Sequence, residues 1–165
     1  MKTNYLAVAA CILINMGLGM SWYGVFGEAW MRGHGFTMAQ VEANASAAPY
    51  IATAVGSVMA GYVLSLLYQR MNVRGWQDGA ITGAAIGSFL FFATVASYLF
   101  SQKSLSLGVL DGGYMFVLFV LYGAVIAVGK RKNRENGPLS INAKNKAIFC
   151  FNYRKWLYYL IIIFN

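Results

Sequence analysis

The sequence is poor in the residues from which most enzyme and metal sites are built. Among its 165 residues are one histidine, two cysteines, two prolines and five acidic residues. The cysteines, Cys11 in an apolar segment and Cys150 far along the chain, do not make a disulfide framework. The single histidine, His34, excludes the HExxH motif and leaves too few ligands for zinc. We therefore predict no metal and no cofactor.

Catalytic motifs are missing as well. No serine or cysteine lies at a recognisable spacing from a general base, and the sequence contains no glycine-rich phosphate-binding loop. These absences predict that the protein is not an enzyme.

The dominant feature of the sequence is four apolar segments with almost no charge, residues 5–25, 49–69, 79–100 and 107–129. Each is about 21 to 23 residues long, which gives roughly 31–35 Å of helix for a hydrocarbon core of about 30 Å. A soluble helix of this length would have a polar face, and these segments have none. The sequence thus predicts an all-α integral membrane protein, with four spans in residues 1–132 and the lipid bilayer around them.

Short connections between the spans predict an up-down four-helix bundle, because helices joined by short loops pack as antiparallel neighbours. Only the first connection, residues 27–48, is long. In it, Thr37 and Gln40 have the spacing of a capping box. We therefore expect a short amphipathic helix there, with Met38 and Val41 on its apolar side.

Basic residues outnumber acidic residues by 13 to 5, for a formal net charge of +8. In the predicted topology Arg32 and Lys103 flank the spans on one side of the membrane. The flanking basic residues on the other side are Lys2, Arg70, Arg74, Lys130, Arg131, Lys132 and Arg134. Because basic residues are retained in the cytoplasm, both termini are predicted to be cytoplasmic.

The same charges bear on binding partners. The run Lys130, Arg131, Lys132 and Arg134 predicts contact with anionic lipid. Nucleic acid is not a predicted partner, because no basic surface with interleaved aromatic residues accompanies the charge.

Residues 133–165 differ from the spans in composition. They are rich in isoleucine, asparagine and lysine, and their longest apolar run, residues 156–164, is too short to cross a membrane. One interpretation is an interfacial anchor on the cytoplasmic side. The other is a non-native appendage without a selected role.

Small residues spaced four apart predict close helix packing. The third span contains the glycine-zipper pattern Gly79, Gly83 and Gly87, and the second contains Gly56 between Ala52 and Ala60. Two hypotheses remain open: packing of the second span on the third, or a homo-oligomer interface. In the first span, the mid-membrane Asn15 is predicted to form a hydrogen bond to another helix.

Polar and aromatic residues collect on the outer side in this topology. Asp111 is the only acidic residue inside a predicted span, where a carboxylate costs roughly 2.5–3.5 kcal/mol at the bilayer centre. The candidate site comprises Glu28, Trp30, His34, Asp111 and Tyr114. We expect it to bind a partner or a small ligand. The alternatives are an interfacial Asp111 that caps its helix, and an oligomeric transporter or channel that uses Asp111 to carry protons.

Several short motifs occur in an order that resembles a known family. They are Ser21-Trp22-Tyr23, Phe26-Gly27-Glu28-Ala29-Trp30-Met31, Ala48-Pro49-Tyr50 and Asp111-Gly112-Gly113-Tyr114. The sequence is similar to the bacterial membrane family known as domain of unknown function 1761, over about residues 4–130. That resemblance implies four transmembrane helices and no assigned activity. Together with the cytoplasmic termini, it predicts a location in the inner membrane of a bacterium.

Overall fold

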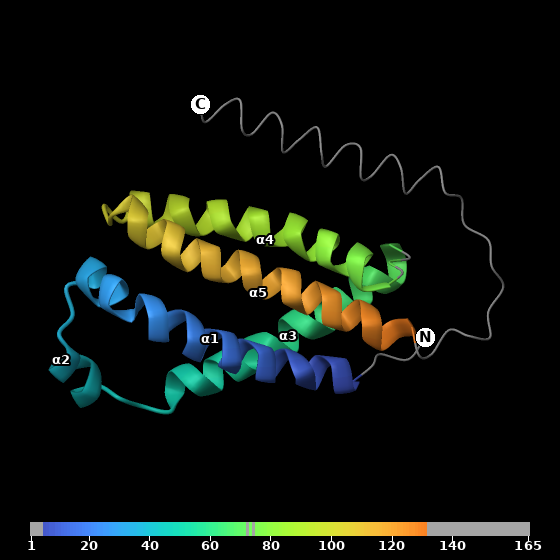
Figure 1. Ribbon diagram of the computed structural model, residues 1–165, viewed down its shortest axis with the longest axis horizontal. Helices are drawn as coiled ribbons and strands as arrows, with labels where there is room; N and C mark the ends of the chain where they lie inside the picture. Colours follow the sequence, from blue (N-terminus) through green and yellow to red (C-terminus); the bar gives the residue numbers. More distant parts are fainter. Residues whose placement is uncertain (1–4, 72, 74, 132–165) are drawn as a thin grey trace, which may run out of the picture. The chain divides into compact units, whose positions relative to one another are not determined.

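The computed structural model describes residues 5–71, 73 and 75–131, and every element among them is a helix (Figure 1). The helices are α1 (Tyr5–His34), α2 (Met38–Ala43), α3 (Ala48–Met71), α4 (Gly75–Phe100) and α5 (Leu105–Arg131). The anionic-lipid prediction at Lys132 and Arg134 and both interpretations of residues 133–165 lie outside the described residues, as do the side chains of Lys130 and Arg131.

Helices α1, α3, α4 and α5 are each long and apolar enough to cross a membrane. The shortest, α3, has 24 residues, or about 36 Å of helix against a hydrocarbon core of about 30 Å. The predicted all-helical fold with four potential spans is confirmed, and it is consistent with a multi-pass membrane protein.

Helix α1 continues nine residues beyond the predicted end of the first span at residue 25. Reaching the membrane boundary does not end a helix, and nothing in the sequence breaks this one before Gly35. There φ is +77°. The Phe36 amide donates to the Met31 carbonyl at 3.0 Å, which is the long hydrogen bond of a Schellman motif. Residues 27–34, predicted to lie in a loop, are therefore helical.

The short predicted helix is present as α2. Thr37 is its N-cap, and its hydroxyl accepts from the Gln40 amide at 3.3 Å. The Gln40 side chain in turn accepts from the Thr37 amide at 2.9 Å, which completes the capping box. Every residue of α2 is exposed.

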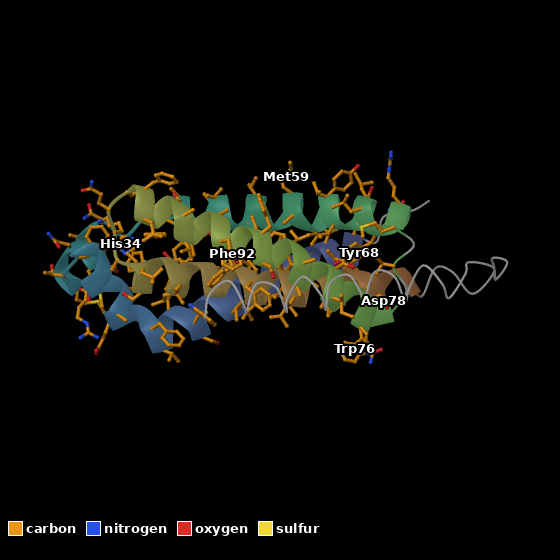
Figure 2. All side chains as sticks on the ribbon, turned by 90° about the horizontal axis from the view of Figure 1, so that it is seen from above. His34, Met59, Tyr68, Trp76, Asp78 and Phe92 are labelled. Atoms are coloured by element: carbon orange, nitrogen blue, oxygen red, sulfur yellow. The ribbon has the colours of Figure 1, made fainter. Side chains whose placement is uncertain are left out.

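Consecutive long helices run in opposite directions, and α5 is the central one, in contact with α1, α3 and α4 (Figure 1). Helices α3 and α4 follow one another in sequence but make little contact. Figure 2 shows His34 near one end of the helices and Trp76 near the opposite end, and these names are used below for the two ends.

The glycines of α4 pack against α5, so the predicted packing of the second span on the third is wrong. A Cβ atom on Gly83 would overlap the carbonyl oxygen of Phe119, and one on Gly79 would overlap that of Gly123. At Gly87 the Phe116 carbonyl oxygen would be 3.0 Å away. Helix α5 supplies the complementary surface because it has small residues of its own at this interface, and α3 makes little contact with α4.

On α3, a Cβ atom at Gly56 would meet nothing within 4 Å. No described helix packs against Gly56, so its predicted role in helix packing is not supported. The link from α3 to α4 is instead a hydrogen bond near the Trp76 end. There the buried Tyr68 hydroxyl donates to the Gly79 carbonyl at 2.8 Å.

Candidate ligand site at the His34 end

Asp111 lies in the second turn of α5 and is partly buried. One carboxylate oxygen accepts from the Tyr23 hydroxyl of α1 at 3.0 Å, and the other accepts from the Tyr98 hydroxyl of α4 at 2.5 Å. A single carboxylate thus joins three helices at the His34 end.

Aromatic side chains of α1 extend from this carboxylate toward the end of the bundle. Tyr23, Trp30 and His34 are seven and four residues apart, so they share one helix face. The Trp30 ring lies 6.0 Å from the Tyr23 ring and 4.3 Å from the His34 ring, between centroids. His34 also lies 6.1 Å from the ring of Tyr98, which closes a loop of contacts around Asp111.

The extension of α1 explains why these residues meet. Had the helix ended at residue 25, Trp30 and His34 would not share the face of Tyr23. Two local contacts hold the end of the helix: the ring of Phe36 stacks on His34 at 5.6 Å, and His34 Nδ1 is 3.1 Å from the Trp30 carbonyl oxygen.

A second polar cluster lies deeper in the bundle, where α1, α3 and α5 meet. The Tyr114 hydroxyl donates to the side-chain oxygen of Asn15. The Asn15 amide nitrogen donates to the Ser57 hydroxyl at 2.8 Å, and Ser57 donates to the Thr53 carbonyl at 2.7 Å. Asn15 therefore bonds both neighbouring helices. The Tyr114 ring is 5.5 Å from that of Tyr23, which connects this cluster to the Asp111 site.

Four of the five predicted site residues thus belong to one connected network: Trp30, His34, Asp111 and Tyr114. Glu28 does not join them. It is exposed, and it lies five residues from Tyr23, about 140° around α1.

A family of proteins of unknown function, DUF1761, matches residues 6–127. The chain belongs to this family. The match confirms the resemblance seen in the sequence motifs, and it covers the Asp111 network completely. No curated protein and no solved structure matches the chain.

Sequence reasoning missed two members of the site in this DUF1761 chain, Tyr23 and Tyr98. A signal for Tyr23 was available in its seven-residue spacing from Trp30, but only if α1 continued past the membrane boundary. For Tyr98 the signal is the hairpin between α4 and α5. The turn of this hairpin is centred near Lys103, and Tyr98 and Gly108 lie five residues before and after that residue. They therefore face each other across the hairpin, where a Cβ atom on Gly108 would lie 3.2 Å from Tyr98 Cβ.

The chemistry of the site is that of a carboxylate among phenols and aromatic rings. In the described part of the chain, Asp111 forms no ion pair within 4 Å, and no group of three or more His, Cys, Asp or Glu side chains could hold a metal ion. The arrangement can orient a negative charge and present ring faces beside it.

Proposed function

We propose that this DUF1761 protein binds a small cationic molecule at the His34 end, with Asp111 as the charged contact. One observation carries the proposal: a carboxylate inside a membrane-spanning helix is held by two phenol hydroxyls and lacks a cationic partner among the described residues.

The charge of Asp111 is the first support. Hydrogen bonds from Tyr23 and Tyr98 orient the carboxylate, but neither donor carries a positive charge. Ionisable side chains within membrane spans are costly, face the bundle interior or a water-filled cavity, and commonly pair with an opposite charge. A cation supplied from outside the chain would complete the pair.

The surrounding rings are the second support. The faces of tryptophan, tyrosine and phenylalanine attract cations, by about 0.5–1 kcal/mol at exposed sites and about 2 kcal/mol where water is excluded. Trp30 and Tyr23 lie edge to face, at an interplanar angle of 77°, and the Tyr23 hydroxyl bonds the carboxylate. An ammonium group near Asp111 would meet both attractions together.

The orientation is part of the proposal. We infer that the His34 end faces away from the cytoplasm of a bacterial inner membrane and that both termini are cytoplasmic. The distribution of basic residues supports this, since Arg32 and Lys103 alone flank the spans at the His34 end. A membrane-impermeant maleimide should label a cysteine at Lys103 in intact cells, and a cysteine at Arg70 only after lysis.

The binding test uses the full chain extracted gently from its own membrane. We expect native mass spectrometry to show a small extra mass on the wild-type protein that is lost in Asp111→Asn. This variant keeps the shape of the side chain and removes its charge. Glu28→Gln is the matched control, because it removes a carboxylate at the same end but outside the network.

Retention of the mass by Asp111→Asn, or its equal loss from Glu28→Gln, would contradict the proposal. A bound mass that carries no positive charge would also contradict it, since a neutral ligand would not pair with the Asp111 carboxylate.

A second candidate function is proton-coupled transport by an oligomer. The observation in its favour is that polar groups continue inward from Asp111 through Tyr114 and Asn15 to Ser57. Partner copies would be needed, because one four-helix bundle is too thin for a wide pore. Proton flux into liposomes that vanishes in Asp111→Asn would support this function, and equal flux in wild type and variant would exclude it.

A further inference from the structure

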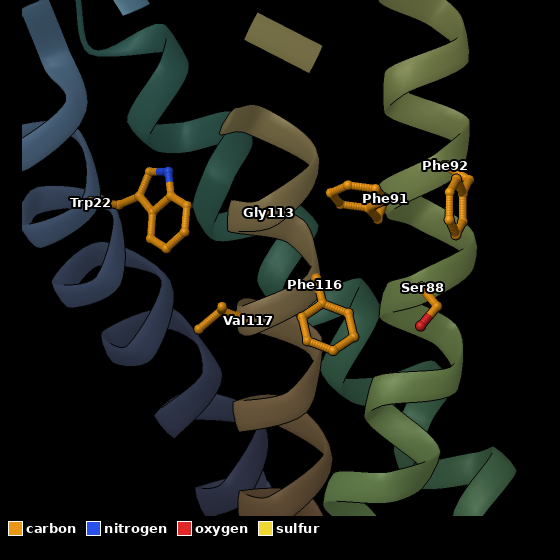
Figure 3. A pocket seen from close by; sticks show the side chains of 7 residues that line it. All are labelled: Trp22, Ser88, Phe91, Phe92, Gly113, Phe116 and Val117. Carbon is orange, nitrogen blue, oxygen red and sulfur yellow. The ribbon is translucent and has the colours of Figure 1, made fainter. Parts of the chain in front are cut away.

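An apolar groove separate from the Asp111 network lies beside α5. Its volume is about 320 Å³, near the lower limit for small-molecule sites. Figure 3 shows Trp22 of α1 on one side of α5 and Phe91 and Phe92 of α4 on the other. The remaining lining residues are Ser88, Gly113, Phe116 and Val117.

The groove exists because of how α5 is flanked. Helices α1 and α4 both pack against α5 but make little direct contact with each other. Gly113 adds no side chain between them, and the Trp22 ring packs so closely on it that a Cβ atom there would lie 3.3 Å from the ring. The aromatic side chains of α1 and α4 form the walls of the groove.

The lining admits hydrocarbon and little else. Six of the seven residues are apolar or glycine, and the seventh, Ser88, already donates its hydroxyl to the Ala84 carbonyl at 2.8 Å. The Trp22 indole N–H lacks a hydrogen-bond partner among the described residues, but it is buried. A polar ligand or an ion would therefore lose its hydration and gain at most this one donor.

The position of the groove along the helices indicates which hydrocarbon fills it. Gly113 is eight residues from Leu105, the first residue of α5, or about 12 Å along the helix. Helix α5 has 27 residues, about 40 Å, so it exceeds a core of about 30 Å by only about 5 Å at each end. The groove thus lies inside the hydrocarbon, in the leaflet at the His34 end.

We propose that this groove binds one acyl chain of a membrane phospholipid from that leaflet and retains it on the protein. A helix with its side chains is about 10–12 Å across, which is too wide for a groove of this volume. A single flexible acyl chain is narrow enough to lie along the groove. Because lipid tails are as apolar as the protein surface, the gain comes from dispersion contacts with the aromatic walls. The proposal does not depend on the Asp111 site.

The test is native mass spectrometry of the full chain, purified in mild detergent with palmitoyl-oleoyl phosphatidylglycerol present. We expect one phospholipid to survive activation that removes the others. Val117→Phe should fill the groove and lower the retained fraction about tenfold, as expected when roughly ten carbon–carbon contacts are lost. Val128→Phe is the matched control, since Val128 is 53% exposed on the same helix and does not line the groove.

A second measurement leaves the groove intact, in case Val117→Phe does not fold. A variant with Trp22 as its only tryptophan is purified from vesicles of phospholipid brominated along the acyl chain, then moved into detergent. Persistent quenching of Trp22 fluorescence supports the proposal. The absence of a retained lipid, recovery of full fluorescence, or a Val117→Phe protein that changes only its subunit count would overturn it.

Discussion

Two regions of this bundle hold helices together by different means. Between α4 and α5, glycines bring the two backbones so close that Gly83 and the Phe119 carbonyl leave no room for a side chain. Where α1, α3 and α5 meet, each pair of helices makes fewer close approaches than α4 and α5 do, and polar side chains join them, with Asn15 at the centre.

The difference reflects the solvent. Lipid tails offer no hydrophobic driving force between helices, so association depends on close packing and on hydrogen bonds between helices. The glycine interface uses the first and the Asn15 junction uses the second. At the glycine interface the buried Tyr68 hydroxyl bonds a backbone carbonyl. At the Asn15 junction side chains bond one another, and this junction lies next to the Asp111 network. The close interface is therefore suited to rigidity, and the polar junction to function.

The largest effect is expected from Gly83→Leu. The new side chain would overlap the α5 backbone, which cannot move aside as a flexible side chain can. We expect a loss of about 3 kcal/mol or more in the free energy of unfolding, or a failure to fold, measured by circular dichroism in detergent.

The control for this variant is Gly24→Leu, in which the same side chain enters a helix at a position with nothing within 4 Å of the Cβ. We expect it to unfold like the wild type. If Gly83→Leu instead keeps its stability and changes only the number of subunits, the glycines form a homo-oligomer interface and the packing on α5 is wrong.

A smaller effect is expected from Asn15→Leu. The substitution removes the hydrogen bonds to Ser57 and Tyr114 together. Such bonds in membrane bundles average about 0.6 kcal/mol, so the expected loss in unfolding free energy is about 1–2 kcal/mol. Ser21→Ala is the control, since the exposed Ser21 hydroxyl donates only to the Gly17 carbonyl of its own helix. Equal stability of Asn15→Leu and Ser21→Ala would show that the junction contributes nothing.

These two regions also mark how far the sequence predicts the structure. The four helices follow from apolar length, and the glycine spacing identified a face for close packing. The helix that packs on that face could not be predicted, because a row of small residues indicates that some helix approaches closely but does not identify it. Choosing α5 over α3 depends on the glycines of α5 that face α4, a match between two helices that the spacing within one helix does not reveal.

The residues that gather around Asp111 were predicted from the sequence only in part. Asp111 stood out because a carboxylate is costly in a span, and Asn15 because an amide there needs a partner. Tyr23 and Tyr98 carry no such signal, since tyrosine is ordinary near a membrane interface. Their role arises from the length of α1 and the register of the α4–α5 hairpin, which single residues do not reveal.

The smallest changes in the free energy of unfolding are expected when the hydroxyl of either of two buried tyrosines is removed. The two substitutions sharpen the comparison because only one of them is expected to destabilise the protein. Tyr68 and Tyr122 are 0% and 1% exposed. The Tyr68 hydroxyl donates to the Gly79 carbonyl. The Tyr122 hydroxyl lies near Ser57 and Asn15 but has hydrogen-bond geometry with no described residue. Tyr68→Phe should lower the free energy of unfolding by about 1 kcal/mol. Tyr122→Phe should leave it unchanged or raise it by about 0.5 kcal/mol, because an unpaired buried hydroxyl is removed.

Thermal unfolding of both variants in one detergent measures the difference, and each is the control for the other. A loss in Tyr122→Phe equal to that in Tyr68→Phe would mean that an internal water pairs with the Tyr122 hydroxyl, and the polar junction would then extend to that residue.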